Sequence, residues 1–467
     1  MFHDPDFMPF TPREKPSIRA TLNNFLENWP PAAYREGFSS LPGLWPFIRV
    51  THFVTDPDLI EEMLITRAND FPRDSMTVRA LSSRINSDSL FFAEDAEWKW
   101  QRRAVAPAFR HENILALVPT FARCAEAQGD AWRARVDAAA PIDAMGAMSR
   151  TTFAVIKRAV LGEESDALDE EKFIEALSPA LASVSWQRFF ALMSVPKWTP
   201  YPGYFRVLAA MRHLQAETAR LIAARRASGA VSHDILGLLL SARDPETGRV
   251  MTDRELTGNL YSFMFAGHET SAVALGWALW LLAKDQTSQN RLREEVRQVA
   301  GAREIGPEEV EKLAFTRQVV QESMRLFPPA AGVGRQPRED TTLGDRKVSK
   351  NEPIYVATWC LHRQEKLWDE PNGFDPDRFT PERIKARHRC AYLPFGAGPR
   401  ICIGMSFAML EMVAILATLV RDFRLKTVPG YRLELQPSLT TRPKGALPLI
   451  VEPIRVAATA SIPLAAE

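Results

Sequence analysis

The chain of 467 residues is 46% hydrophobic and carries a net charge of only +1, so its composition is that of a globular protein with a sizeable core. A charge so close to zero argues against a general nucleic-acid binder, because such proteins need a basic field to attract phosphates. At about 150 residues per domain, the length suggests roughly three domains. However, the 34 prolines are scattered and no glycine- or serine-rich linker interrupts the chain, so we expect a single large domain.

The cysteines and the apolar stretches predict a soluble, cytoplasmic protein. The four cysteines, Cys124, Cys360, Cys390 and Cys402, are too irregularly spaced for a disulfide framework or a zinc-binding pair, and a reducing compartment is the simpler interpretation. The first ten residues have no apolar core, so they do not form a signal peptide. No uncharged stretch reaches the roughly 18–20 apolar residues that span a bilayer.

The chain as a whole predicts a mainly α fold with small β-sheets (α+β). The expected elements, in chain order, are a strand at Phe47–Phe53, a helix begun by Asp56 and Pro57, mainly helical sequence from Glu94 to the early 320s, a strand at Pro353–Thr358 after the break at Pro328 and Pro329, and a helix at Ser406–Val420. Residues from Val456 onward look frayed.

The segment from Thr252 to Lys284 predicts a long buried helix. Thr252 and Glu255 form a capping box, and apolar character continues to Lys284 without a proline. About 30 residues at 1.5 Å per residue make a helix of some 45–50 Å. A helix of that length and apolar character has to cross the core of the domain.

A glycine-rich loop around one cysteine is the most informative part of the chain: Phe395-Gly396-Ala397-Gly398-Pro399-Arg400-Ile401-Cys402-Ile403-Gly404. It precedes an apolar helix, whose free N–H groups and dipole stabilise a thiolate. Gly398 and Gly404 permit the backbone to approach a flat, bulky group, and Arg400 offers a cation for a carboxylate. A lone cysteine is more often a small buried hydrophobe, which is our interpretation of Cys124 and Cys360. A dinucleotide-binding loop is excluded because the third glycine is missing.

This loop resembles the FxxGxRxCxG signature of the cytochrome P450 family, the haem-thiolate monooxygenases, through Phe395, Gly398, Arg400, Cys402 and Gly404. The resemblance runs from about residue 57 to 450. It implies a single-domain P450 fold with the long helix over a haem b cofactor and Cys402 as the axial ligand of the iron.

The expected division of the chain is an N-terminal extension at residues 1–20, a P450 domain at 21–455 and a flexible tail at 456–467. Asp345 and Asn351 stand where many family members have glycines, in the strand pair that follows the ExxR helix described next.

Three further residues resemble the structural fastening of the family's cysteine loop. Glu322 and Arg325 match the ExxR pair, and Arg378 in the segment Phe374-Asp375-Pro376-Asp377-Arg378-Phe379 matches the arginine that completes an ion-paired triad. Without the third partner, Glu322 and Arg325 would be an ordinary helix-surface pair worth a few tenths of a kcal/mol.

The segment Ala266-Gly267-His268-Glu269-Thr270 resembles the family's oxygen-activation motif. The resemblance implies that Thr270 presents its hydroxyl to bound oxygen and that Glu269 points aside, towards water, to relay protons. A helical glycine costs up to about 1 kcal/mol against alanine, so we expect Gly267 to make room for dioxygen. We expect His268 to be structural and not a ligand.

Two haem propionates would need buried cations or donors. Trp98 and Arg102 match the family's WxxxR pair, Arg335 occupies the position of another propionate arginine, and Arg400 is the third candidate.

The implied reaction inserts one atom of O2 into an organic substrate, with electrons from a separate ferredoxin or flavodoxin and its reductase. A basic patch for docking that partner is formed by Lys366, Arg383, Lys385, Arg387 and Arg389, although interleaved acids are equally typical of a plain solvated loop. We expect a monomer without nucleic-acid partners.

The substrate pocket is expected to draw on residues 76–92, 184–205, 330–333 and 439–440. The second segment is rich in aromatic residues, which fits a mobile lid, core packing or a membrane-contacting patch. We expect a hydrophobic substrate, such as a fatty acid or a terpenoid-like molecule.

Three rival functions stay open. The first is a peroxide-driven or rearranging haem-thiolate enzyme, which loss of the acid–alcohol pair would favour; Glu269 and Thr270 are present. The second is a non-catalytic haem-binding sensor. The third is a helical scaffold without cofactor, which would be colourless.

Overall fold

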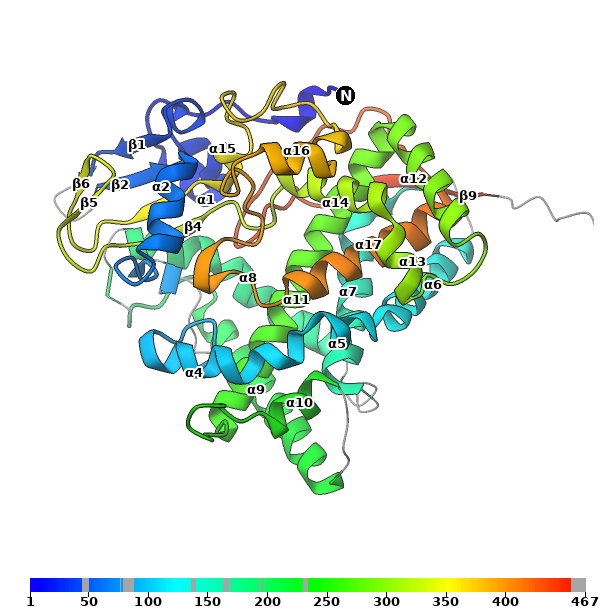
Figure 1. Cartoon of the computed structure of the whole chain (residues 1–467), viewed down its shortest axis with the longest axis horizontal. Helices are drawn as coiled ribbons and strands as arrows, with labels where there is room; N and C mark the ends of the chain where they lie inside the picture. Colours follow the sequence, from blue (N-terminus) through cyan, green and yellow to red (C-terminus); the bar gives the residue numbers. More distant parts are fainter. Residues whose placement is uncertain are drawn as a thin grey trace, which may run out of the picture.

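The protein is described here by a computed structural model that covers residues 1–43, 50–75, 77–78, 88–135, 140–162, 168, 170–192, 195–196, 198–229 and 234–454. It is mainly helical with small β-sheets, which confirms the expected fold class (Figure 1). The strands β1, β2, β5 and β6 gather on one side of the molecule beside α2, whereas α6, α12 and α13 lie on the other side.

The α-helices of the described residues are α1 (Ile18–Asn23), α2 (Pro57–Glu61), α4 (Asp95–Val105), α5 (His111–Leu115), α6 (Val118–Arg133), α7 (Ala144–Leu161), α8 (Glu170–Leu192), α9 (Tyr204–Ser228), α10 (Ile235–Ser241), α11 (Asp253–Lys284), α12 (Gln286–Val299), α13 (Pro307–Lys312), α14 (Ala314–Leu326), α15 (Thr358–Leu361), α16 (Pro381–Ala386) and α17 (Met405–Asp422). Shorter helical turns are η1 (Pro5–Phe7), η2 (Phe25–Asn28), η3 (Pro31–Tyr34), η4 (Glu62–Thr66), η5 (Ala106–Phe109), η7 (Pro376–Phe379) and η8 (Gly398–Arg400).

The strands form three small sheets. They are β1 (Phe38–Leu41), β2 (Thr51–Val54), β3 (Ile142–Asp143), β4 (Val333–Arg335), β5 (Thr341–Leu343), β6 (Arg346–Val348), β7 (Ile354–Val356), β8 (Phe423–Thr427) and β9 (Pro448–Pro453). Their orders are β1-β2-β7-β4, β3-β9-β8 and β5-β6. The parallel pair of β2 with β7 joins the first and last thirds of the chain, with His52 opposite Ile354.

Helix α11 is the long helix that the sequence predicts, and it crosses the core beside α7 and α17 (Figure 1). The Thr252 hydroxyl accepts from the Glu255 N–H, and the Glu255 carboxylate accepts from the Thr252 N–H, which confirms the capping box. Close approach to α7 depends on small residues. A Cβ on Gly267 would lie 2.9 Å from Ile156, and one on Gly276 would lie 2.5 Å from Met145.

The local predictions agree with the structure where it describes them. The Asp56 carboxylate accepts from two N–H groups at the start of α2, as its position before Pro57 predicts. The helix expected at 406–420 is α17, and the strand expected at 353–358 contains β7. Only residues 50–53 of the strand expected at 47–53 are described, and β2 begins at Thr51.

The two departures from the family pattern lie in turns. Asn351 adopts a left-handed conformation with φ 62°, which asparagine tolerates better than most residues. In the turn between β5 and β6 the positive φ falls on Gly344, so the neighbouring Asp345 is unstrained.

The N-terminal segment packs against the domain instead of extending from it. Phe7 is fully buried against Trp280, Phe2 pairs with Phe374, and Lys284 at the end of α11 binds two aspartates of the segment at 2.7 and 2.8 Å. The expected boundary at residue 21 therefore does not mark the edge of the domain. The tail expected at 456–467 lies outside the described residues. None of the described helices has the length and apolar character needed to span a membrane.

Candidate active site

The cysteine loop, residues 395–404, contains η8 and leads directly into α17. The Cys402 N–H donates to the Phe395 carbonyl at 3.0 Å, which closes the loop, and the Gly404 N–H faces the Cys402 sulfur. Burial raises the pKa of the Cys402 thiol, opposed by the Gly404 amide and by the nearby Arg102 cation. The cysteine is nevertheless exposed.

Two glycines of this loop have positive φ for different reasons. Gly396 (φ 73°) has open space beside it, whereas a Cβ on Gly398 (φ 71°) would overlap the Leu64 carbonyl oxygen in η4. The close backbone approach expected at Gly398 is therefore made to another part of the protein chain. It fixes the cysteine loop to η4.

The triad expected behind the cysteine loop is present. Arg325 donates to both Glu322 oxygens, at 2.7 and 2.8 Å, and the Arg378 Nε lies 3.5 Å from Glu322 Oε1. Glu322 and Arg325 are fully buried. Arg325 also donates to the carbonyls of His362, Pro371 and Gly373, so α14 is fastened to the segment that leads into η7.

The α11 face, formed by Ala266 and Thr270, borders open space. Ala266 is exposed although most of the helix around it is buried, and Thr270 is half-buried. The Thr270 hydroxyl donates to the Ala266 carbonyl at 2.7 Å. This bond fixes the hydroxyl rotamer, engages the hydroxyl proton and leaves the oxygen lone pairs free to accept.

The expectation that Glu269 points to water is wrong. Its side chain is only 1% exposed, and its carboxylate accepts from the Thr440 hydroxyl at 2.6 Å and from the Arg442 Nε at 2.7 Å. Burial opposes ionisation, but the Arg442 cation and these hydrogen bonds lower the pKa of Glu269 below its usual value. The sequence gives no local signal for this pair, because its partners lie about 170 residues away in the turn between Leu435 and Pro443.

The neighbouring residues of the motif serve packing. Gly267 faces Ile156 of α7. The absence of a side chain at this position lets the two helices come close together, and it does not create the expected space for dioxygen. The His268 Nε2 forms a hydrogen bond with the Ser149 hydroxyl at 2.7 Å, and the imidazole ring packs edge-on against Phe153. Burial lowers the pKa of His268 to about 4, in accord with the structural role expected for it.

Trp98, Arg335 and Arg400 lie together along one cleft, as a shared propionate site requires. Arg335 is 8% exposed and forms no ion pair within the described part of the chain. Burial and the Arg400 cation lower the pKa of Arg335 to about 10. Arg400, in contrast, already has an anion, because it donates to Glu94 at 2.6 Å while stacking on Trp98. The expectation that Arg400 is free to bind a propionate therefore needs correction.

Arg73 is a half-buried cation that no motif in the sequence indicates. It forms a β-bridge with Arg335, and its Nη1 is buried without a hydrogen-bond partner among the described residues. Burial, with the Arg400 and Arg335 cations, lowers the pKa of Arg73 to about 9. Because Arg73 is a single arginine in an irregular segment, only its bridge to β4 reveals it.

These features fit a haem. Arg73 and Arg335 have no carboxylate partner among the described residues, and the two propionates of a haem would supply the missing charge. Cys402 is exposed although protein surrounds its thiol, and Ala266 is exposed on a helix that is otherwise largely buried. Arg102 lies near that thiol. Burial lowers the pKa of Arg102, and the charge of a Cys402 thiolate opposes this decrease.

A sequence model described as Cytochrome P450 matches residues 31–449. The chain belongs to the cytochrome P450 family. Membership of this family implies a haem cofactor, molecular oxygen, a hydrophobic substrate and a redox partner, and this P450 is a monooxygenase.

Curated relatives and a solved structure agree with this assignment. Cyclooctatin synthase of Streptomyces melanosporofaciens is 32% identical over 87% of each chain. Cyclooctat-9-en-7-ol 5-monooxygenase of the same organism is 30% identical over 96% of this chain and 97% of that protein. The human ultra-long-chain fatty acid omega-hydroxylase is 30% identical over 85% and 78%. The crystal structure of the cytochrome P450DA haem domain superposes with a TM-score of 0.77 at 25% identity, covering 90% of each chain.

Three of the five cations in the expected basic docking patch of this P450 are engaged in contacts within the protein. Arg387 stacks on Trp368 at 4.1 Å and is half-buried, so its charge is not free for docking. Arg389 binds Glu61, and Arg383 lies 3.3 Å from Asp375. Lys366 and Lys385 remain as exposed cations.

The aromatic segment divides into two clusters. Trp186, Phe189 and Phe190 pack together on α8, whereas Trp198 and Phe205 are 80% and 76% exposed. Parts of two expected pocket segments lie outside the described residues. They are 193–194 and 197 in the segment 184–205, and 76 and 79–87 in the segment 76–92.

Proposed function

We propose that Cys402 is the axial ligand of haem b, and that Arg73, Arg102 and Arg335 with Trp98 hold its propionates. The observation that carries this proposal is Cys402, a residue that is exposed although protein desolvates its thiol. The bound haem supplies reductive activation of dioxygen, which inserts one oxygen atom into the substrate and releases the other as water. The protein residues position the substrate, exclude water and deliver protons.

Glu269 is the proposed proton source for the reacting oxygen, and the Thr270 hydroxyl is the proposed hydrogen-bond acceptor beside it. The Thr270 hydroxyl is held by the Ala266 carbonyl, which keeps its lone pairs directed to the open side of α11. Glu269 is adjacent but bound to Arg442 and Thr440. Proton delivery by Glu269 therefore requires its carboxylate to leave Arg442 and turn toward Thr270.

The test of the ligand is the absorption spectrum of the reduced protein with carbon monoxide. The red-shifted Soret band of thiolate ligation is expected in the wild type and lost in Cys402→Ala. Cys124→Ser is the matched control, because this thiol is buried near Arg158 on α7 and keeps the band. A band that survives Cys402→Ala contradicts the assignment. For the proton path, Thr270→Ala is expected to consume electrons without forming an equivalent amount of product.

The proposed substrate is a terpenoid-like hydrophobic molecule. Two bacterial relatives that span almost this whole chain are named for cyclooctatin and cyclooctat-9-en-7-ol. The apolar residues Ala330 and Ala266 are exposed inside otherwise buried surroundings, which supports an apolar binding space. Cyclooctat-9-en-7-ol and a panel of terpenoids should shift the spin state of the bound haem. A panel without any shift contradicts this substrate class.

A fatty acid is the second candidate, because Arg188 of α8 provides a cation near the same space. Its guanidinium lies 3.7 Å from the Phe25 ring centre and 3.5 Å from the Ser438 carbonyl, two residues before Thr440. Burial lowers the pKa of Arg188, and no ion pair to it is formed within the described ranges. A buried cation without an acid partner is suited to a carboxylate.

Palmitic acid and its methyl ester distinguish the two substrate classes. If Arg188 binds a carboxylate, Arg188→Gln should weaken palmitate binding at least tenfold and leave the ester unchanged. Arg206→Gln, at an exposed arginine of α9, is the control. Equal binding of acid and ester by the wild type would rule out the fatty acid assignment.

Electrons are proposed to come from a separate ferredoxin or flavodoxin with its reductase. The retained Glu269–Thr270 pair supports this route over a peroxide-driven or rearranging enzyme and over a haem-binding sensor. Oxygen consumption and product with a surrogate ferredoxin system support the proposal. Product with hydrogen peroxide alone supports the peroxide-driven rival, and no turnover with either supports the sensor.

A further inference from the structure

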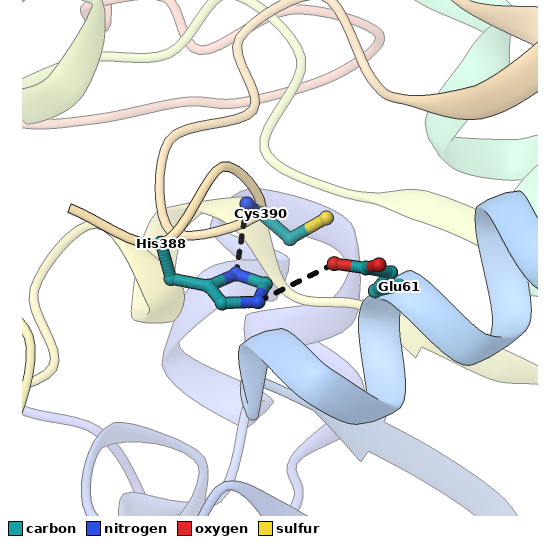
Figure 2. Close-up of side chains that lie close together, drawn as sticks. All are labelled: Glu61, His388 and Cys390. Carbon is teal, nitrogen blue, oxygen red and sulfur yellow. Dashed lines mark hydrogen bonds and ion pairs between the residues drawn. The ribbon is translucent and has the colours of Figure 1, made fainter. Parts of the chain in front are cut away.

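Three potential metal ligands converge outside the active site, on the far side of the cysteine loop. Glu61 projects from α2, and His388 and Cys390 come from the segment that follows α16 (Figure 2). One ligand atom from each residue lies within 4.8 Å of the others. Cys390 is 1% exposed, whereas Glu61 and His388 are about one-third exposed, so the group opens to solvent on one side.

The contacts within this cluster leave the sulfur unexplained. The His388 Nε2 lies 3.3 Å from Glu61 Oε2 and 3.4 Å from Asp58 Oδ1, and the Cys390 N–H donates to His388 Nδ1 at 3.1 Å. The Cys390 sulfur forms no hydrogen bond in the described part of the chain. An ion-pair cluster needs a histidine and carboxylates, but it does not need a buried thiol facing them.

The kind of donor selects the metal. A thiolate, an imidazole and a carboxylate are the ligands that zinc prefers, whereas calcium and magnesium take oxygen ligands. Donor atoms at about 2.0–2.3 Å from zinc lie roughly 3.3–3.8 Å apart, so the three groups must close by about 1 Å. Glu61 and His388 can do so because they are partly exposed, and Asp58 or a water completes four ligands.

We propose that Glu61, His388 and Cys390 form a zinc site that links α2 to the segment leading into the cysteine loop. Binding releases the thiol proton of Cys390 and requires the His388 tautomer that leaves its coordinating nitrogen unprotonated. If Nε2 coordinates, the Cys390 N–H···Nδ1 bond is given up. The Arg389–Glu61 ion pair also yields, and such exposed pairs contribute little to stability.

The position of the site gives it a structural consequence. Glu61 lies three residues before Leu64, whose carbonyl contacts Gly398 of the cysteine loop. Cys390 lies five residues before Phe395, whose carbonyl accepts from Cys402. Zinc would therefore hold together the two segments whose contact shapes the cysteine loop.

The test is metal titration of the chelator-treated, haem-loaded protein. With Zn2+ in competition against a chromophoric chelator, we expect one tight site per chain. With Co2+ we expect the visible bands of tetrahedral cobalt and a sulfur-to-cobalt charge-transfer band. Cys390→Ser should remove the charge-transfer band and weaken zinc at least tenfold, and His388→Gln should weaken it similarly.

Two control variants separate the site from general effects. Cys124→Ser should leave both metals unaffected, and Arg389→Gln should bind zinc as tightly as the wild type or more tightly, because it frees Glu61. The thiolate Soret band of each variant reports folding, so a Cys390→Ser protein that fails to fold leaves His388→Gln to decide. Absence of a stoichiometric site in the wild type, or zinc binding unchanged in the folded variant, overturns the proposal.

Discussion

The cysteine loop and the α11 face are the two parts of the proposed haem site, and they are held in different ways. The cysteine loop is fixed by backbone contacts and by the buried Glu322–Arg325–Arg378 triad, which have no need to move. On the α11 face, the groups proposed to act are held by side-chain bonds, Thr270 to Ala266 and Glu269 to Arg442. The proposed ligand side is thus preorganised, whereas the side proposed to deliver protons has to break its side-chain bonds first.

The largest expected effect is on the triad. Glu322→Gln keeps the shape of the side chain but leaves Arg325 and Arg378 buried without an anion, which should cost about 3–5 kcal/mol of unfolding free energy. Urea denaturation followed by circular dichroism, together with haem content, measures this loss. Glu308→Gln is the control, because Glu308 is an exposed partner of Lys312. A loss below about 1 kcal/mol would show that the cysteine loop does not depend on the triad.

The next effect separates two glycines of the same loop. Both Gly396→Ala and Gly398→Ala place a side chain at positive φ, which costs about 1–2 kcal/mol. Only Gly398→Ala also collides with the Leu64 backbone, so we expect a total of about 2–5 kcal/mol and weaker haem retention. Haem transfer to apomyoglobin measures the retention. Equal rates for the two variants would contradict a backbone contact that shapes the loop.

On the α11 face, Arg442→Gln should destabilise the protein by about 2–3 kcal/mol near pH 7. In the wild type, the lowered pKa of Glu269 stabilises the protein at pH values above 4.5, the ordinary pKa of a glutamate. This stabilisation is lost as the pH falls through the pKa of Glu269 in the folded protein. In the variant, burial is no longer opposed by the Arg442 cation, so that pKa rises although the Thr440 hydrogen bond remains. The difference between the proteins should therefore grow from pH 4 to pH 7. Lys444→Gln, at an exposed partner of Glu434, should show no such growth.

The smallest effect is expected at Glu411. This residue is fully buried on α17, the helix that follows the cysteine loop, and lies beside Ser271 of α11. Burial raises the pKa of Glu411 from 4.5 to about 8. A carboxyl group with a raised folded pKa lowers stability as the pH rises from 4.5 toward 8. Glu411→Gln should remove this slope, a change of about 1 kcal/mol between pH 5.5 and 6.5. Parallel pH profiles of the two proteins would contradict the assignment.

The sequence predicts the cysteine-loop side far better than the α11 side. The loop, the Glu322–Arg325 pair and the capping box of α11 are set by residues close together in the chain, so local spacing reveals them. The environment of Glu269 is set by Arg442, 173 residues away. Its direction depends on how a distant turn packs on α11, which local spacing does not encode.

The same limit applies to the other residues whose surroundings differ from the sequence-based prediction. Gly267 was expected to face dioxygen, but the path of α7 decides which side of α11 needs a glycine. Arg73 becomes a half-buried partner of Arg335 only through a bridge between distant segments. Arg400 has its charge neutralised by Glu94, which the motif does not include.

The pairing of Phe2 with Phe374, and of Asp4 and Asp6 with Lys284, bears on how the chain is made. At about 5–20 residues per second, Phe374 leaves the ribosome roughly 20–70 s after Phe2. During that interval the first residues have no partner to pack against, and Phe7 stays uncovered until Trp280 arrives. The beginning of this chain is therefore among the last parts to reach its native place during synthesis.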